Sequence, residues 1–450
     1  MTKNNHTTTR REFLARTTSG AAGITVATLA ARANAAKETG RGHYEIFQPG
    51  QIGKMKLKNR LCRSAAYMNS GSFLPETEGE VTDDTIRIHK AYAEGEVALT
   101  MTGYMAVMDY GKKGTHVCAS HDRYIPGLAR MADAIHGVGN DCKVVAEIGH
   151  DGTATPTLPG RIPTMISPTG EEWPSRIGPS GINWSGNQDG HILTEAEIDR
   201  FTSDMGQAAR RLKEAGWDGC NLHGAHHYLI NTFMSPFTNR RSDKYGGSME
   251  KRVEIVREIV AKIRDAAGSD FAIIIKLNCN DGRSDDGTPE ETDIHSFPRI
   301  AKLVEAAGVD AIDVSGDDQI RVGINSPELQ SYYKEYTAAT DIKIPVMLSG
   351  GNRDVELLEE IYKRQVGRID FFNFARPLIR QPHLIKQWLD GGDPQSECIN
   401  VSLCFYAMYR ERGNPKPARC IILEQERLAR EAISKARGED GQSAGGFGVG

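Results

Sequence analysis

The stretch that decides the fold is a short run that ends in a cluster of polar and aromatic residues: Gly219-Cys220-Asn221-Leu222-His223-Gly224-Ala225-His226-His227-Tyr228-Leu229. Its first four residues are mostly apolar, which is typical of a strand covered on both faces. Side chains that can do chemistry follow this strand directly. Because functional residues gather at the carboxyl ends of parallel strands, we expect a parallel sheet with a site at that edge.

Seven other short apolar runs recur along the chain, separated by stretches with helical periodicity. They are Leu61–Ala65, Val97–Thr102, Lys143–Ile148, Ala272–Leu277, Ala311–Val314, Val346–Leu348 and Phe371–Phe374. Eight strands that alternate with helices predict an α/β fold, a single-domain (β/α)8 TIM barrel. The alternative is an open doubly wound sheet, which has less support because no strand is followed by a Gly-x-Gly-x-x-Gly turn.

The connecting helices carry start signals in the sequence. Asp83 or Asp84 can cap the helix after the first strand, and Thr194-Glu195-Ala196-Glu197 forms a capping box for another. Met249–Ala266 has apolar residues at helical spacing. These signals place helices between the predicted strands, as a barrel requires.

The N-terminus has the pattern of an export signal. Thr9-Arg10-Arg11-Glu12-Phe13-Leu14 is a twin-arginine motif, Ser19–Ala31 is weakly apolar, and Ala33-Asn34-Ala35 is a small-x-small cleavage site. The alternative is a frayed basic terminus. We expect residues 1–35 to be a twin-arginine signal peptide, and the protein to be periplasmic or secreted.

The rest of the chain divides by composition. The barrel is expected over residues 44–390, a C-terminal extension over 391–437, and a disordered Gly-rich tail over 438–450. Asp151–Gly190, after the third strand, is rich in Pro, Gly and Ser and is expected to form a lid over the barrel mouth.

The overall composition excludes several partners. The net charge is −4 with 25% charged residues, so nothing indicates a nucleic acid or an anionic membrane as partner. No apolar run reaches the roughly 18–20 residues that span a bilayer. We expect a small-molecule substrate.

The ends of the last two predicted strands form one unit. Gly350 and Gly351 follow the seventh strand and offer backbone N–H groups, and Ala375-Arg376 follows the eighth and supplies a guanidinium. The loops after strands seven and eight are the usual phosphate site of this barrel. The plainer alternative is a tight turn and a surface arginine.

His223, His226, His227 and Tyr228 allow several roles. A zinc site is one, although no His-Glu-x-x-His pattern is present, and structural core histidines are another. The sharper hypothesis is that His223 and His226 hold a carbonyl oxygen and stabilise the charge that develops on it, while Tyr228 donates a proton.

The sequence as a whole resembles the Old Yellow Enzyme family of FMN-dependent oxidoreductases. Within that family it is most similar to the bacterial branch that resembles 2,4-dienoyl-CoA reductase. The resemblance runs from about Tyr44 to Trp388. It is carried by the stretches His223–Leu229, Phe233–Ser248, Leu57–Arg60, Arg63–Ala65, Glu147–His150 and Arg376–Ile379.

The resemblance implies an FMN across the barrel mouth and assigns roles to the strand ends. The flavin would be lined by backbone at Ser64, Ala65, Ala66 and Gly103. Glu147 would face its pyrimidine edge, and Lys276 would approach N1 and O2. The phosphate would lie at Gly350, Gly351, Ala375 and Arg376, as the strand ends alone suggest.

The implied reaction is reduction of the activated C=C bond of an α,β-unsaturated carbonyl compound. Hydride would come from flavin N5, His223 and His226 would polarise the carbonyl, and Tyr228 would protonate the α-carbon. A rival activity is an FMN-dependent amine dehydrogenase or demethylase, which would not need the histidine pair. A rival from another class is a non-redox barrel, such as an aldolase or a phosphate-ligand-binding protein.

The chain departs from the family pattern at three site positions. Glu147 stands where the family usually has glutamine, and a carboxylate only accepts hydrogen bonds unless it is protonated. His227 replaces the usual glycine, which adds bulk and a titratable group beside Tyr228. Lys276 stands where arginine is frequent; it keeps a cation near N1 and could pair with Glu147.

The C-terminal cysteines also depart from the pattern. Clustered relatives carry a Cys-x-x-Cys-x(2–3)-Cys run and a fourth cysteine, whereas this chain has Cys398, Val401, Cys404 and Cys420 at those positions. Three thiolates are too few for a four-thiolate iron–sulfur cluster, so no metal is expected. The three cysteines could instead form disulfides after export.

Export leaves the electron donor open. Relatives commonly use NAD(P)H, which is scarce outside the cytoplasm, so the donor could be NAD(P)H or a periplasmic redox protein. No Cys-x-x-Cys-His haem-attachment motif is present in the chain.

Overall fold

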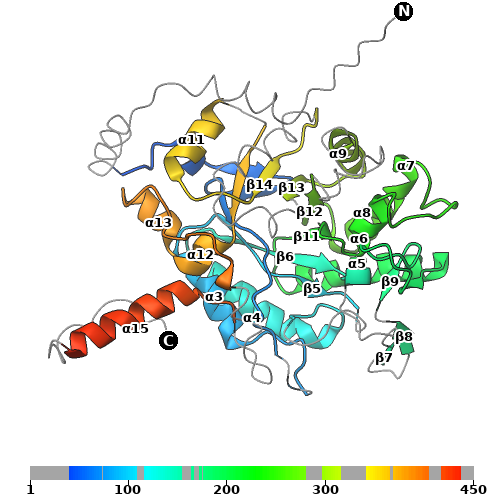
Figure 1. Cartoon of the computed structure of the whole chain (residues 1–450). Coiled ribbons are helices and arrows are strands. Elements are labelled where there is room, and N and C mark those ends of the chain that lie inside the picture. Colours follow the sequence, from blue (N-terminus) through cyan, green and yellow to red (C-terminus); the bar gives the residue numbers. More distant parts are fainter. Residues whose placement is uncertain are drawn as a thin grey trace, which may run out of the picture.

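The sheet closes into a barrel of eight parallel strands (Figure 1). A computed structural model describes residues 40–72, 74, 76–108, 116–154, 164–166, 172–174, 176–279, 296–315, 341–364, 368–404 and 417–436. The barrel strands are β3 (Leu61–Arg63), β4 (Leu99–Met101), β6 (Lys143–Gly149), β11 (Gly219–Gly224), β12 (Ala272–Asn278), β13 (Ala311–Ser315), β14 (Val346–Ser349) and β15 (Phe371–Phe374). They pair in that order, and β15 pairs back with β3. The TIM barrel is confirmed, and the open sheet is wrong.

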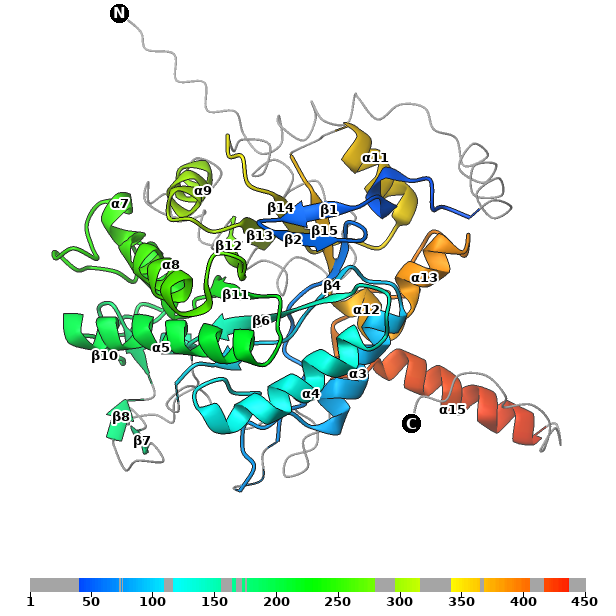
Figure 2. The same ribbon diagram turned by 180° about the vertical axis from the view of Figure 1, so that it is seen from behind.

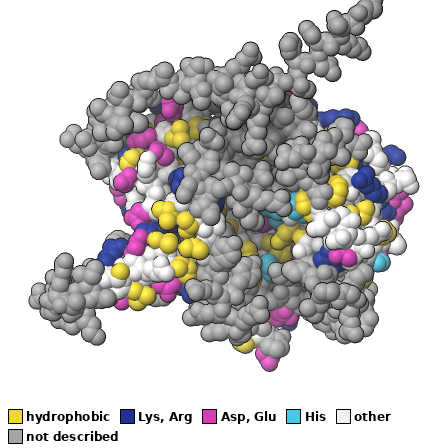
Figure 3. Space-filling model, viewed as in Figure 1, with side chains coloured by type: hydrophobic (Ala, Val, Ile, Leu, Met, Phe, Trp, Pro, Cys, Tyr) yellow, Lys and Arg dark blue, Asp and Glu magenta, His cyan; other side chains and the backbone are white. Residues whose placement is uncertain are grey.

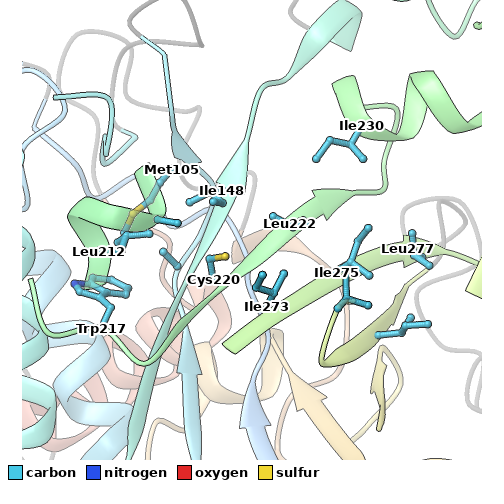
Figure 4. Packing of buried hydrophobic residues seen from close by; sticks show 14 of the residues in the cluster. Met105, Ile148, Leu212, Trp217, Cys220, Leu222, Ile230, Ile273, Ile275 and Leu277 are labelled. Atoms are coloured by element: carbon cyan, nitrogen blue, oxygen red, sulfur yellow. The ribbon is translucent and has the colours of Figure 1, made fainter. Parts of the chain in front are cut away.

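Two apolar layers hold the barrel together. Residues that point out of the strands, such as Leu222 and Ile273, pack with helix residues such as Leu212 and Ile230 (Figure 4). Residues that point inward form a separate cluster in the lower barrel, which includes Cys62, Leu99, Val145, Ile274, Met347 and Phe371. All of these side chains are buried. The wholly apolar runs in the sequence reflect this double coverage.

An N-terminal hairpin closes the floor of the barrel. Strand β1 (Gly50–Ile52) pairs antiparallel with β2 (Met55–Leu57). Ile52, Met55 and Leu57 belong to the same buried cluster as the inward-facing strand residues. Figure 2 shows the hairpin beside the barrel strands. The lower end is therefore filled with apolar side chains, and polar strand residues lie at the other end.

Helices surround the sheet. They are α3 (Asp83–Glu94), α4 (Ile125–His136), α5 (Glu195–Glu214), α6 (Leu229–Met234), α7 (Met249–Arg252), α8 (Glu254–Ala267), α9 (Phe297–Ala306), α11 (Val355–Arg364), α12 (Arg376–Arg380), α13 (Leu384–Leu389) and α15 (Ile421–Ala436), with single 3-10 turns η2 (Glu45–Phe47), η3 (Asp122–Tyr124) and η4 (Gly152–Ala154). The predicted capping box at Thr194 and Glu197 is confirmed.

Two helix predictions need correction. The N-cap of α3 is Thr82, whose Oγ1 accepts from the Thr85 backbone N at 3.2 Å, and Asp83 and Asp84 lie in the first turn. Acidic residues are favoured there by the helix dipole, so first-turn and cap positions look alike in sequence. The helix predicted over Met249–Ala266 is two helices, which meet at Val253.

The predicted lid is more regular than its composition suggests. Within Asp151–Gly190, β7 (Thr164–Ile166) pairs with β8 (Glu172–Pro174), and β9 (Ile177–Gly178) pairs with β10 (His191–Ile192), which begins just after it. A further short strand, β5 (Met105–Ala106), extends the sheet beside β6. Residues 155–163, 167–171 and 175 of this segment lie outside the described residues.

The structure describes only part of the segments predicted at the two ends of the chain. The signal sequence at residues 1–35 and the tail at 438–450 lie outside the described residues. The C-terminal extension contains α15, which no sequence signal led us to expect and which projects from the body (Figures 1 and 2). Among the described residues, no helix combines the length and apolarity that crossing a membrane requires.

Candidate active site

The predicted site residues lie together at the carboxyl edge of the barrel. The strand register places His223 beside Lys276 and Asn221 beside Glu147. On the other side, Ser349 pairs with Asn373, and the strand end at Ser64 joins them because its backbone N donates to Phe374 O at 2.9 Å. Closure of the sheet thus brings residues that are far apart in sequence to one mouth.

A buried layer of charge lies just below this mouth. The Lys276 ammonium donates to Glu147 Oε2, and its Nζ lies 3.7 Å from Asp313 Oδ2 and 3.4 Å from Ala65 O. Burial opposes the charged ammonium, but the charges of Glu147 and Asp313 outweigh burial and raise the pKa of Lys276. The pairing of Glu147 with Lys276, which the sequence left open, is therefore present.

Asp313 connects this layer to the opposite strand ends and was missed in the sequence. Its Oδ1 accepts from Ser349 Oγ at 2.7 Å and from Asn373 Nδ2 at 2.8 Å. Ser349 Oγ in turn lies 3.2 Å from Ser64 Oγ. Burial raises the pKa of Asp313, and Lys276 opposes that rise. A lone aspartate inside an apolar strand was the signal that could have revealed it.

The β14–β15 end offers exposed backbone. Gly350 and Gly351 have φ values of 99° and 71°, in the left-handed region that glycine adopts without steric cost. Asn352 Nδ2 fixes the two strands by donating to Leu348 O at 2.8 Å and Asn373 O at 2.9 Å. The turn can thus present N–H groups to an anion without an intervening side chain.

Arg376 lies beside this turn, after Ala375. Its NH1 donates to Ser402 Oγ at 2.7 Å and approaches Asn400 O at 3.4 Å. The guanidinium is therefore held by the C-terminal extension, a contact that the sequence did not predict. An arginine has five N–H donors in a planar fork, a geometry that matches the oxygens of a phosphate.

Close backbone approach explains the small residues after β3 and β4. A Cβ at Gly103 would lie 2.6 Å from Ala66 O, so only glycine fits there. The neighbouring Thr102 Oγ1 is buried and has no hydrogen-bond partner among the residues that the structure describes. A ligand that supplies a polar atom at this position would complete the site.

His223, His226 and Tyr228 form one aromatic group. The ring centroids of His223 lie 5.2 Å from His226 and 4.1 Å from Tyr228. Burial, and after it the charge of Lys276, hold the pKa of His223 well below its usual range. His223 is therefore a neutral imidazole, and its Nδ1 lies 3.9 Å from Glu147 Oε2. Figure 3 shows histidine and apolar side chains gathered near the middle of one face.

A second tyrosine and a histidine extend this group and were not predicted. Tyr104 follows Gly103 directly, and its ring lies edge-on to Tyr228 at 5.4 Å and to His116 at 5.1 Å. The Tyr104 hydroxyl donates to Gly149 O at 3.1 Å. Burial, and after it the charge of Asp151, raise the pKa of Tyr104 well above its usual value. Tyr104 therefore supports the Tyr228 ring and stays protonated.

The C-terminal cysteines lie apart from this mouth. Cys398, Cys404 and Cys420 line a cavity of about 30 Å³, and none of them is part of a disulfide in the structure. Within the described ranges, no group of three or more His, Cys, Asp or Glu side chains is arranged to hold a metal ion. Disulfide formation by these cysteines after export remains a prediction.

Comparison with known proteins bears on the identity of the chain. Residues 45–391 match the model of the NADH:flavin oxidoreductase / NADH oxidase family. The 4,4'-dithiodibutanoate disulfide reductase of Rhodococcus erythropolis is 29% identical over 413 residues, 84% of this chain and 94% of that protein. A metal reductase of Desulforamulus reducens is 31% identical over 385 residues, 84% of this chain, but the chain spans only 53% of that longer protein.

The fold is shared with solved structures. The complex of 2-naphthoyl-CoA reductase with 2-naphthoyl-CoA superposes with a TM-score of 0.66 at 24% identity, over 79% of this chain and 54% of that one. At 24% identity this similarity supports the fold alone, whereas the match to the family model supports the type of chemistry. The chain belongs to the NADH:flavin oxidoreductase / NADH oxidase family: it is a flavin oxidoreductase on a TIM barrel, and its cofactor is FMN.

Proposed function

We propose that this enzyme reduces the activated C=C bond of an α,β-unsaturated carbonyl compound. The observation that carries the proposal is the grouping of His223, His226 and Tyr228 at the end of β11, with ring centroids 4.1 Å and 5.2 Å from His223. Two imidazoles beside a phenol can hold a carbonyl oxygen and deliver a proton to the same substrate. Family membership excludes the non-redox barrel that the sequence left as an alternative.

The barrel mouth has the features that an FMN would need. We propose that the left-handed turn at Gly350 and Gly351, with Ala375 and Arg376, takes the phosphate. The close approach of Gly103 to Ala66 leaves flat backbone for the ring system, and the unsatisfied Thr102 Oγ1 lies next to it. In the same proposal, the remaining contacts come from Ser64, Ala65, Glu147 and Lys276.

His223 and Tyr228 have different roles in the proposed reaction. FMN, when bound, supplies the hydride that the β-carbon receives. His223 donates a hydrogen bond as a neutral imidazole, because burial keeps its pKa low. Negative charge that develops on the carbonyl oxygen is then stabilised by donors that are already in place. The half-buried Tyr228 delivers the proton to the α-carbon.

The test separates the two halves of the reaction. The purified holoenzyme is reduced anaerobically and mixed in turn with enones and enoates, the oxidised holoenzyme is mixed anaerobically with amines, and flavin absorbance is followed in both cases. We expect reoxidation by enones, and Tyr228→Phe should slow it by about 10²–10⁴-fold while leaving flavin reduction unchanged. Tyr245→Phe is the matched control, because the Tyr245 hydroxyl contacts Glu258 away from the site.

The same screen decides against the rival activity. An amine dehydrogenase would show flavin reduction by amines, and its rate would not depend on His223. Turnover with amines and none with enones would overturn the proposed function. A loss in both half-reactions of Tyr228→Phe would remove Tyr228 from the role of proton donor.

The electron donor and the location belong to the same proposal. The family description names NADH, which supports a nicotinamide donor. The twin-arginine motif supports export of the folded enzyme with FMN already bound. Fractionation of cells that express the chain would find activity in the periplasm, and Arg10→Lys/Arg11→Lys would retain it in the cytoplasm. If the parent and the Arg10→Lys/Arg11→Lys variant divided in the same way between cytoplasm and periplasm, export through the twin-arginine motif would be contradicted.

A further inference from the structure

The turn that carries the proposed catalytic residues has an unfavourable backbone. His226 and His227 have φ values of 55° and 63°, so two consecutive residues with side chains adopt the left-handed region. Non-glycine residues rarely do so, although histidine is tolerated better than most. Asn278 Oδ1 accepts from the His226 N at 3.3 Å, and Asn231 Oδ1 accepts from the His227 N at 2.9 Å. A glycine at 227 would adopt this turn at less cost, so the imidazole should have a compensating role.

The His227 ring is stacked on a residue from a distant part of the chain. Its centroid lies 3.7 Å from that of Trp184, with an angle of 19° between the planes. Trp184 also meets Phe237 edge-on at 5.6 Å. Trp184 lies between β9 and β10, in the connection that follows β6. The stack therefore joins this connection to the turn after β11.

Trp184 is held in place by its own turn. Asn183 Oδ1 accepts from the backbone N of Ser185 at 2.9 Å and of Asn187 at 3.0 Å. Asn183 Nδ2 donates to Asp189, which also pairs with Arg176 at 2.8 Å. The indole is thus presented on a turn whose geometry does not depend on His227. Such a fixed surface can restrain a strained neighbour.

We infer that the Trp184–His227 stack is a positioning pair that holds His226 and Tyr228 in their working geometry. His227 lies between these two residues in sequence, so its ring fixes the backbone of both. His226 Nε2 lies 3.0 Å from Ser315 Oγ, and the Tyr228 ring packs on His223, so small backbone shifts would misalign both groups. The inference rests on the proposed function, because it assigns those groups their roles.

The experiment is a double-mutant cycle on the holoenzyme. His227→Gly and Trp184→Leu remove the two halves of the stack, and His227→Phe keeps a ring that can stack. Reoxidation of the reduced enzyme by 2-cyclohexen-1-one should fall by about tenfold to a hundredfold in each of the first two variants. The double variant should lose no more than either single variant, because both break the same contact. His227→Phe should stay within about twofold of the parent.

A positioning role for the stack also predicts which kinetic constants change. The loss should appear in kcat, with KM nearly unchanged, and flavin reduction should keep its rate. A full rate in His227→Gly, or losses that multiply in the double variant, would overturn the inference. A rise in KM alone would also overturn it, since that would make the stack a wall of the substrate pocket.

A second readout does not need turnover. Amide hydrogen exchange of the peptide over residues 225–231 should be faster in Trp184→Leu than in the parent holoenzyme, whereas His227→Phe, which keeps a ring to stack on Trp184, should retain the protection of the parent. Unchanged exchange in Trp184→Leu would refute the stack as a restraint. If the parent enzyme reduces no enone, the proposed function fails, while this exchange result still decides whether the stack holds the turn.

Discussion

The β14–β15 end and the β11 end of the barrel mouth are built differently. At the first, the backbone carries the site: Gly350 and Gly351 form a left-handed turn, and Asn352 ties the two strand ends together. At the second, side chains carry it: the rings of His223 and Tyr228 lie 4.1 Å apart on a turn with unfavourable φ values. The first end is the proposed site of the cofactor phosphate, which remains bound between turnovers. The second end is the proposed site of the substrate, which is exchanged in each turnover.

The two ends share one support. The buried layer of Lys276, Glu147 and Asp313 reaches His223 on one side and Ser349 on the other. A change in this layer should therefore affect both ends, whereas a change at either end should stay local. This difference can be tested by substitutions at each of the three places.

The largest effect is expected from the shared layer. Lys276→Met leaves Glu147 and Asp313 buried without their cation, which should cost about 3–5 kcal/mol of unfolding free energy. Urea unfolding of the holoenzyme measures it. Adding Glu147→Gln should recover part of the loss because one buried charge is removed. A loss within about 1 kcal/mol would mean that the layer does not support the two ends.

The next largest effect is expected at the β11 end. In the proposed reaction, His223→Leu removes one donor to the carbonyl oxygen and should slow enone reduction by about 10²–10³-fold. FMN affinity, measured by titration of the apoprotein, should be unchanged. A weaker FMN complex in this variant would show that the two ends are not independent.

A smaller effect is expected at the β14–β15 end. In the proposed FMN site, Arg376→Gln removes charge-assisted hydrogen bonds to the phosphate, worth about 1.5–3 kcal/mol, so FMN should bind about ten- to a hundredfold more weakly. Both half-reactions should recover at saturating FMN. Arg353→Gln is the control, since Arg353 contacts Cys398 O in the C-terminal extension. Equal FMN affinity in Arg376→Gln and the parent would rule out the phosphate role.

The redox potential reports on the middle of the mouth. Glu147→Gln replaces a carboxylate with a neutral amide, so the FMN midpoint potential should rise, because a negative charge that disfavours the reduced flavin is removed. Spectroelectrochemical titration measures it. An unchanged or lower potential would contradict the placement of Glu147 at the flavin edge.

The smallest effect concerns pH. A histidine with an ordinary pKa of about 6.5 would gain a proton below that pH and lose its acceptor. Burial lowers the pKa of His223, so the neutral form persists as the pH falls through 6.5. The rate of flavin reoxidation by the parent enzyme should therefore show no inflection near pH 6.5 that can be assigned to His223. The test compares this pH profile with that of His223→Asn. Such an inflection would mean that His223 is accessible to water.

The sequence predicted the barrel well because each strand is a local apolar run. All eight strands were located, and no strand end differs from its prediction by more than two residues. The strand ends at Gly350, His223 and Lys276 could be named for the same reason. The link through Asp313 could not, since it joins four strands only after the sheet has closed.

The contacts that were missed are all long-range. Tyr104 meets Tyr228 across the mouth, and Arg376 meets Ser402 of the C-terminal extension. No periodicity or spacing encodes such contacts. Helix caps failed for a different reason, because Thr82 and the acidic residues after it are all compatible with a helix start.

The closed floor of the barrel has a kinetic consequence. Because Ile52, Met55 and Leu57 fill the lower end, the polar layer faces the carboxyl edge of the barrel in the part of the chain that the structure describes. We expect the electron donor and the oxidising substrate to enter through this mouth in turn, so that the first product leaves before the second reactant binds. Steady-state plots at several donor concentrations should accordingly give parallel lines.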